Sequence, residues 1–162
     1  MYKCGICGSE MDKMVDLGKL PLASDFLDPK NPVEKYWYDG VWAWCDGCQM
    51  LQLSDPPPIE LVYTPDYQYL SGMSKYMDWH FKRTARGLVN RYNPKNVIEP
   101  AANDGGILQF IKDRPVLGVD PMDKACEIMA QKGVPRLHAA FTHDRSKLIA
   151  DDFGKFDLVF MA

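Results

Sequence analysis

VIEPAANDGG, residues 97–106, is the stretch that decides how the second half of this chain folds. Two branched apolar residues lead into Glu99, and small residues then precede Asn103 and Asp104. A short apolar run that ends in such a turn is typical of a buried strand followed by a loop. Asn103 tolerates the left-handed backbone conformation that a sharp turn requires. The stretch therefore predicts a strand-to-helix turn, which either cradles a cofactor or only connects two elements.

The residues after this loop alternate between strand-like and helix-like patterns. The apolar, strand-like runs are 96–100, 115–120, 136–141 and 156–162. The helix-like stretches between them are 106–113, 123–133 and 143–153. Strands that alternate with helices of about ten residues predict βαβ units and a parallel sheet. The expected fold class is α/β, with a Rossmann-like sheet of about four parallel strands.

Four of the five cysteines form two pairs, Cys4-x2-Cys7 and Cys45-x2-Cys48. This spacing lets both thiolates of a pair bind one tetrahedral ion, and four thiolates leave no open position, as in structural zinc sites. The alternatives are a redox motif or two coincidental pairs. We predict a structural zinc ion. The glycines expected to give the two turns their conformational freedom are Gly5, Gly8 and Gly47.

Composition divides the chain into three parts. Residues 1–57 are rich in turns and aromatic residues and form the expected small, zinc-ribbon-like domain. The prolines at 56–58 cannot continue a helix or a central strand, so they mark a boundary. Residues 58–93 form a Tyr-rich connector and a helix, with helical spacing from about 71 to 92. Residues 94–162 form the first half of the cofactor-binding α/β domain.

Global composition excludes several classes of protein. Apolar residues make up 46% of the chain and charged residues 25%, as in ordinary globular proteins. The net charge of -3 and the lack of an evident Arg/Lys stripe disfavour nucleic-acid binding. The sequence has no run of 18 apolar residues and no signal-peptide core at its start. We therefore expect a cytoplasmic protein without a membrane span.

The charge of the loop indicates a class of cofactor. The G-x-G-x-x-G and G-x-x-x-x-G-K-[ST] patterns are absent, so neither a dinucleotide nor a triphosphate is expected. Acidic side chains would repel phosphate but accept the ammonium and ribose groups of S-adenosylmethionine. Asp120 ends the next strand, 21 residues after Glu99, which suits ribose hydroxyls, although a generic turn with a surface Asp gives the same pattern. The predicted cofactor-binding residues of this region are Glu99, Ala101, Asn103, Asp104, Gly105 and Asp120.

The combination of motifs resembles the zinc-containing, S-adenosylmethionine-dependent sugar C-methyltransferases. The motifs are the two CxxC pairs, LGKLPLASDFL (17–27), YTPDYQYLSGMSKYMDWHF (63–81), VIEPAANDGGILQF (97–110) and FDLVFMA (156–162). The resemblance implies a class I methyltransferase sheet and methylation of a ring carbon in a nucleotide-linked deoxysugar. The family's loop E-I-G-S-N-D-G maps onto residues 99–105, where this chain has Ala101 in place of the glycine.

The resemblance also implies roles for individual residues. Asp120 would hold the adenosine ribose, and Phe141 and Thr142 would flank the adenine. Tyr76 and His80 share a helix face and form the predicted catalytic pair, able to contact a sugar or assist proton transfer, although their spacing also fits a half-buried structural pair. Further polar residues of the same segment, which lines the substrate side in the family, are Tyr67, Tyr69, Ser71 and Ser74.

The family carries its catalytic base after the fourth strand, beyond Ala162. Our hypothesis is that this chain, as an N-terminal fragment or a shortened relative, keeps the zinc and cofactor half and lacks the base. An open half-sheet predicts a partner chain or a C-terminal domain along its edge. One alternative is a non-catalytic zinc-containing adaptor. Another is a nucleic-acid amino-methyltransferase relative, because EPAANDG is similar to the Glu-Pro-x-Ala-Gly loops of adenine methyltransferases.

Overall fold

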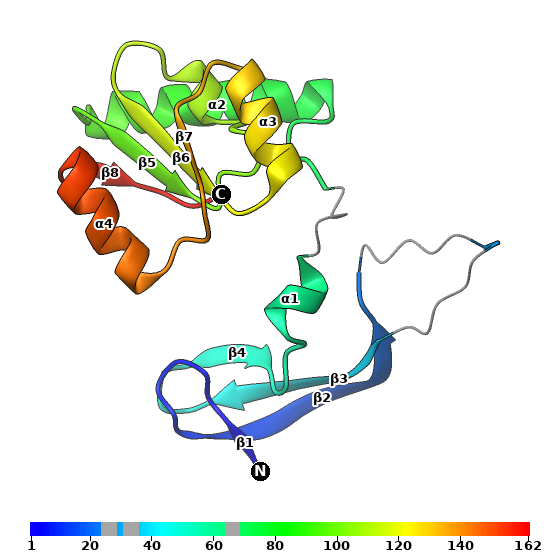
Figure 1. Cartoon of the computed structure of the whole chain (residues 1–162). Helices are drawn as coiled ribbons and strands as arrows, with labels where there is room; N and C mark the ends of the chain where they lie inside the picture. Colours follow the sequence, from blue (N-terminus) through cyan, green and yellow to red (C-terminus); the bar gives the residue numbers. More distant parts are fainter. Residues whose placement is uncertain (24–28, 31–35, 64–68) are drawn as a thin grey trace. The chain divides into compact units, whose positions relative to one another are not determined.

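The computed structural model describes residues 1–23, 29–30, 36–63 and 69–162 (Figure 1). The chain divides into two compact units, Met1–Tyr67 and Gln68–Ala162. Within the described ranges, none of the helices combines the length and the apolar character that crossing a bilayer requires.

The first unit is built on an antiparallel sheet with the strand order β1-β2-β3-β4. The strands are β1 (Tyr2–Lys3), β2 (Glu10–Pro21), β3 (Trp37–Cys45) and β4 (Met50–Leu53), and the short helix α1 (Ile59–Val62) follows them. In β3, Val41, Ala43 and Cys45 point inward at every second position, as a half-buried strand requires. The buried core under the sheet is small, and it consists of Cys4, Met11, Ala43 and Cys45. A core of this size needs an additional link such as a metal ion.

The second unit contains a parallel sheet, as the sequence predicts. Its strands are β5 (Val97–Pro100), β6 (Val116–Asp120), β7 (Arg136–His138) and β8 (Leu158–Val159). Their spatial order is β7-β6-β5-β8. The helices are α2 (Lys75–Tyr92), the 3-10 turn η1 (Leu108–Phe110), α3 (Asp123–Gln131) and α4 (His143–Phe153). The α/β class and the four parallel strands are therefore confirmed.

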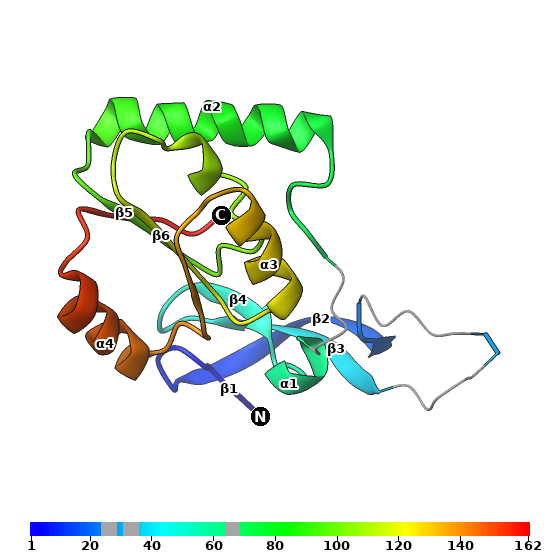
Figure 2. The same ribbon diagram turned by 45° about the horizontal axis from the view of Figure 1, so that its top comes forward.

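Helices cover both faces of this parallel sheet (Figure 2). On one face, Phe81 of α2 and Met129 of α3 pack with Val97. On the other face, Ile149 of α4 packs with Ile98. Val97 and Ile98 serve opposite faces because successive side chains of a strand alternate. The near-continuous apolar run at the start of β5 follows from this two-sided burial.

Helix α2 begins after Ser74, whose side chain caps the first turn. Ser74 accepts a hydrogen bond on its Oγ from the Met77 N–H at 3.1 Å. This bond satisfies one of the free N–H groups of the first turn. The helix ends at Asn93, which takes a left-handed conformation with φ of 40°. The helix predicted over about 71–92 is confirmed from Lys75 onward, and it begins four residues later than expected.

The helix predicted for residues 106–113 is wrong. The structure has only the single 3-10 turn η1 there, and Ile111 is already extended. Gly105 takes a φ of 68°, which no right-handed helix can include, and Gly106 adds a second poor helix former. The apolar residues that suggested a helix lie in a tight turn instead. This turn buries Ile107, Leu108 and Ile111 in the core.

Candidate functional site

The four paired cysteines of the first unit form one cluster. Their Sγ atoms all lie within 4.8 Å of one another. The Cys4 and Cys48 sulfurs are 3.6 Å apart, and the Cys7 and Cys45 sulfurs are 3.5 Å apart. A tetrahedral zinc ion with Zn–S bonds of about 2.3 Å places its ligand sulfurs about 3.8 Å apart. The cluster therefore has the ligand type, number and spacing of a structural zinc site.

Each cysteine pair sits on a tight turn of the same design. The Gly8 N–H donates to the Cys4 carbonyl at 3.0 Å, and the Gln49 N–H donates to the Cys45 carbonyl at 2.7 Å. Both donors lie in the left-handed region, Gly8 with φ of 75° and Gln49 with φ of 57°. The two turns thus curl each pair of thiols back toward a common centre.

The glycines contribute differently from the sequence expectation. Gly8 supplies backbone freedom as expected, but in the second turn that conformation belongs to Gln49, so the role expected for Gly47 is wrong. A Cβ at Gly47 would lie 2.7 Å from Ser9 Oγ, so a larger residue there would require the Ser9 side chain to move. Gly5 has neither a positive φ nor a close neighbour that excludes a side chain.

Hydrogen bonds and burial pull the thiol pKa values in opposite directions. The Cys4 sulfur accepts hydrogen bonds from the backbone N–H groups of Cys7 and Ile6 and from the side-chain amide of Gln52. These bonds stabilise the thiolate and lower the pKa of Cys4 to about 6. Burial and the neighbouring thiols raise the pKa of Cys48 to about 12. Four adjacent thiols cannot all ionise without a compensating charge. A divalent cation supplies that charge, which agrees with the geometry of the cluster.

A cavity of about 180 Å³ lies at the carboxyl end of β5 in the second unit. Its lining includes Glu99 of β5 and Ala101 directly after it, Tyr69 and Ser71 before α2, and Ala162 after β8. The chain proceeds from β5 through β6 to β7 on one side and then crosses to β8 on the other. Open α/β sheets bind ligands where the strand order reverses in this way. The predicted cofactor loop therefore borders the expected crevice.

The loop itself alternates between left-handed and right-handed or extended residues. Ala101, Asn103 and Gly105 have φ values of 53°, 48° and 68°. The left-handed conformation predicted for Asn103 is confirmed. Ala101, which stands where the resembling family has glycine, takes the same conformation with a Cβ, at a cost of about 1–2 kcal/mol.

Replacing Ala101 by glycine should therefore stabilise the second unit. We expect the free energy of unfolding to rise by roughly 0.5–1 kcal/mol, because relief of the left-handed strain exceeds the extra flexibility of glycine in the unfolded chain. Urea denaturation measures the change. The matched control is Ala102→Gly, since Ala102 is buried without a positive φ and should lose stability. Equal losses for both variants would contradict this account of the loop.

Asn103 ties three segments together through hydrogen bonds. Its backbone N–H donates to Asp120 Oδ2 at 2.8 Å. Its Oδ1 accepts from the Ser71 and Asp104 N–H groups, both at 2.9 Å. Its Nδ2 donates to the Tyr69 carbonyl at 3.1 Å. The segment before α2 is consequently fixed on the loop, with Tyr69 and Ser71 at the cavity.

Two buried carboxylates of this region keep an oxygen without a partner. Asp104 Oδ2 accepts from the Gly72 N–H at 3.0 Å and from Lys132 Nζ at 2.8 Å. In the described part of the chain, nothing bonds Asp104 Oδ1 or Glu99 Oε2. Glu99 is 3% exposed. Burial, and then the charges of Asp104 and Asp120, raise the pKa of Glu99 to about 8. A positively charged ligand beside Glu99 would favour the ionised form of this carboxyl and offset the cost of its burial.

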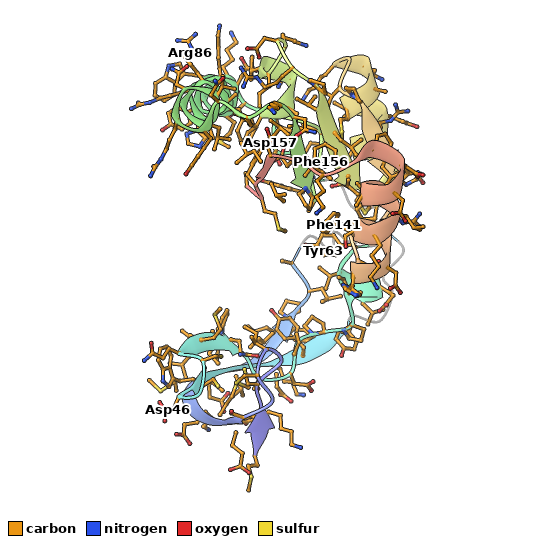
Figure 3. All side chains as sticks on the ribbon, turned by 90° about the vertical axis from the view of Figure 1, so that its left-hand side faces the viewer. Asp46, Tyr63, Arg86, Phe141, Phe156 and Asp157 are labelled. Atoms are coloured by element: carbon orange, nitrogen blue, oxygen red, sulfur yellow. The ribbon has the colours of Figure 1, made fainter. Side chains whose placement is uncertain are left out.

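Asp120 is also buried, and both of its oxygens are used. Oδ2 accepts from Asn103, and Oδ1 accepts from the Met122 N–H at 2.9 Å. Asp120 therefore holds the loops after β5 and β6 together, and its ribose contact stays a prediction. Phe141 lies elsewhere, in a hollow of about 300 Å³ beside α4 that also contains Phe156 (Figure 3).

The predicted catalytic pair lies outside the cavity. Tyr76 is 70% exposed, and His80 is exposed as well. The residues with which α2 lines the cavity are Met77 and Phe81. A catalytic role for Tyr76 and His80 thus stays a prediction. Tyr67 lies outside the described residues.

The sequence reasoning missed Lys132 and Gly72 as partners of Asp104. A Cβ on Gly72 would lie 2.5 Å from Asp104 Oδ2, so any larger residue there would displace this carboxylate. Gly72 and Lys132 are 32 and 28 residues from Asp104 in sequence, and no local pattern connects them.

Comparison with known families bears on the first unit. Residues 4–63 match the family model Methyltransf_13, described as "Putative zinc binding domain". The match includes both cysteine pairs, and together with the sulfur cluster it fits a zinc-binding, methyltransferase-related domain. Among curated proteins, none matches the chain.

Proposed function

We propose that this chain belongs to an S-adenosylmethionine-dependent C-methyltransferase that acts on a nucleotide-linked deoxysugar. The observation that carries the proposal is the cavity after β5, whose lining includes Glu99, with its Oε2 buried and without a hydrogen-bond partner among the described residues. The match of the first unit to a methyltransferase-related domain supports the reaction class. The strand order β7-β6-β5-β8 supports a Rossmann-like sheet, because it corresponds to the order 3-2-1-4 of such folds.

The residues around the cavity fit one end of the cofactor. S-adenosylmethionine carries a positive ammonium and a positive sulfonium, and when bound it supplies an electrophilic methyl group. Glu99 would face a positive group, and Asn103 and Gly105 shape the loop around it. The cavity of about 180 Å³ is smaller than the roughly 300 Å³ at which complete small-molecule pockets begin, so it would hold one end only. Asp120 would reach the ribose through lone pairs that its two hydrogen bonds leave free.

The proposed substrate side is the segment fixed by Asn103. Methylation of a carbon next to a ketone requires removal of a proton, so polar groups must face the reacting carbon. Tyr69 and Ser71 line the cavity and are the described residues best placed for this contact. The sugar itself and a base after the fourth strand are implied only by the family resemblance. We also propose that a partner chain or further domain covers β8, which is the last strand of its sheet.

Binding of S-adenosylmethionine at pH 7 should release a proton from Glu99. With a pKa of about 8, this carboxyl is mostly protonated in the free protein, and a neighbouring positive charge favours its ionised form. We expect release of up to about 0.9 proton per site at pH 7. Calorimetry in buffers of different ionisation enthalpy measures this number directly.

The control is Glu99→Gln, which should lose most of the proton release. Binding without proton release in the original chain would show that the positive group does not lie at Glu99. No binding at all, at two temperatures, would remove the proposed cofactor.

A further inference from the structure

Helix α2 carries a group of three positively charged side chains on its exposed surface. Lys82, Arg83 and Arg86 recur at a spacing that places them on one helix surface, and all three are exposed. Figure 3 shows Arg86 pointing away from the helix. The expectation that the chain has no Arg/Lys stripe is therefore wrong. These three residues are not all consecutive in the sequence, and only the helix brings them together on one surface.

A second element adds to this charge. Lys112, in the loop after η1, joins Lys82 and Arg86 around a hollow of about 290 Å³. Ala85, Val89 and Phe110 also line this hollow and provide apolar surface. An adjoining hollow of about 460 Å³ is lined by Trp79 with Lys82, Arg83 and Arg86. We call the three cations of the first hollow, Lys82, Arg86 and Lys112, the basic rim.

The basic rim is not neutralised within the described part of the chain. Its members form no ion pair there. Asp113 is the acidic residue of the lining, and Arg114 holds its two oxygens at 3.0 and 2.7 Å. The Arg114 pairing lowers the pKa of Asp113, so it stays ionised but paired. The positive field of the rim therefore remains available to a ligand.

The aromatic residues beside the rim are exposed rather than buried. Trp79 is 53% exposed, and the Arg83 guanidinium lies 5.6 Å from the centre of its ring. Tyr76 lies next to Trp79, with ring centres 5.8 Å apart. A flat apolar surface beside unpaired cations suits a ligand with a planar body and an anionic group.

We infer that the basic rim on α2 and the loop after η1 binds the phosphate groups of a small phosphorylated ligand. Lys82, Arg86 and Lys112 contact the phosphate oxygens, and the apolar lining receives the body of the ligand. This hollow shares no residue with the cavity after β5. The inference is therefore independent of the proposed cofactor site.

The experiment titrates the full zinc-loaded chain with uridine diphosphate, inorganic pyrophosphate and uridine. A pyrimidine nucleotide is chosen because the proposed cofactor site would recognise adenosine. We expect uridine diphosphate and pyrophosphate to bind and uridine not to bind. The double variant Arg86→Gln/Lys112→Gln should weaken both by roughly tenfold or more, because it removes two charge-assisted contacts. The charge-matched control Lys95→Gln/Lys124→Gln should bind as the original chain does.

Several results would overturn the inference. The first is that neither uridine diphosphate nor pyrophosphate binds. The second is that uridine binds as tightly as uridine diphosphate, and the third is that both double variants lose the same amount of affinity. Tighter, strongly salt-dependent binding of an oligothymidine would assign the surface to single-stranded nucleic acid instead. Circular dichroism of both double variants checks that they are folded. Binding of S-adenosylmethionine by the Arg86→Gln/Lys112→Gln chain is measured in parallel. This measurement tests the proposed cofactor site separately from the phosphate site at the basic rim.

Discussion

Replacement of Cys45 by serine is expected to abolish metal binding and to unfold the first unit. Cys45 is fully buried, and it belongs to a core of only four buried residues. Structural zinc contributes about 10–16 kcal/mol to the folding of small zinc domains, far more than such a core can replace. We expect the zinc content to fall from one ion per chain to nearly none. The second unit, which has its own core, should keep its unfolding transition.

The matched control for this experiment is Cys126→Ser. Cys126 is buried in α3 of the second unit, and its Sγ donates to the Asp120 carbonyl at 3.3 Å, a bond that serine can keep. This variant should retain one zinc ion and a folded first unit. Zinc content by elemental analysis and the backbone NMR spectrum report both properties. A Cys45→Ser chain that still holds one zinc ion and shows unchanged spectra would contradict the four-thiolate site.

The second large effect is a pH-dependent gain in stability on replacing Glu99 by glutamine. Burial and nearby charges raise the pKa of Glu99 from 4.5 in the ordinary state to about 8 in the fold. Between these values the folded chain holds a proton that the unfolded chain releases. The free energy of unfolding therefore falls as the pH rises through this window, by about 1.4 kcal/mol per unit and roughly 5 kcal/mol in all. Glutamine removes this loss.

Denaturation curves from pH 5 to pH 9 test the sign of the effect. The Glu99→Gln chain should differ little from the original at pH 5 and should exceed it by several kcal/mol near pH 8. Glu127→Gln is the control, since Glu127 is exposed on α3 and should change stability by only a few tenths of a kcal/mol. If stability changes with pH in the same way for the original chain and for Glu99→Gln, the pKa of Glu99 is not raised in the fold, and this account of the buried carboxyl is wrong.

The sequence predicts those parts of the fold that depend on local patterns. The strands and the helices α3 and α4 follow from short-range periodicity, and the zinc ligands follow from the spacing of their turns. The helix expected over 106–113 did not form, because two glycines outweigh the apolar pattern. In the second CxxC turn, nothing in the sequence marks Gln49 rather than Gly47 as the left-handed residue.

The residues of the candidate site could likewise be predicted only where they belong to one local sequence pattern. Glu99 and Asn103 could be predicted because both belong to one short loop. The partnership of Asp104 with Lys132 could not, since it depends on how α3 packs. Burial of Phe81 and Ala85 fixes the phase of α2 and turns Tyr76 outward. A two-residue motif on a helix cannot indicate which face the core will use.

The most direct test of the proposed function is equilibrium dialysis of the full zinc-loaded chain against radiolabelled S-adenosylmethionine. We expect one molecule bound per chain and competition by the demethylated product. Ser71→Leu places a larger side chain in the cavity after β5 and should prevent binding, whereas Asn90→Leu, at an exposed position near the end of α2, should not. Binding that is lost with Ser71→Leu alone is the predicted result. No binding to the original chain, or equal binding to both variants, would contradict a cofactor site in this cavity.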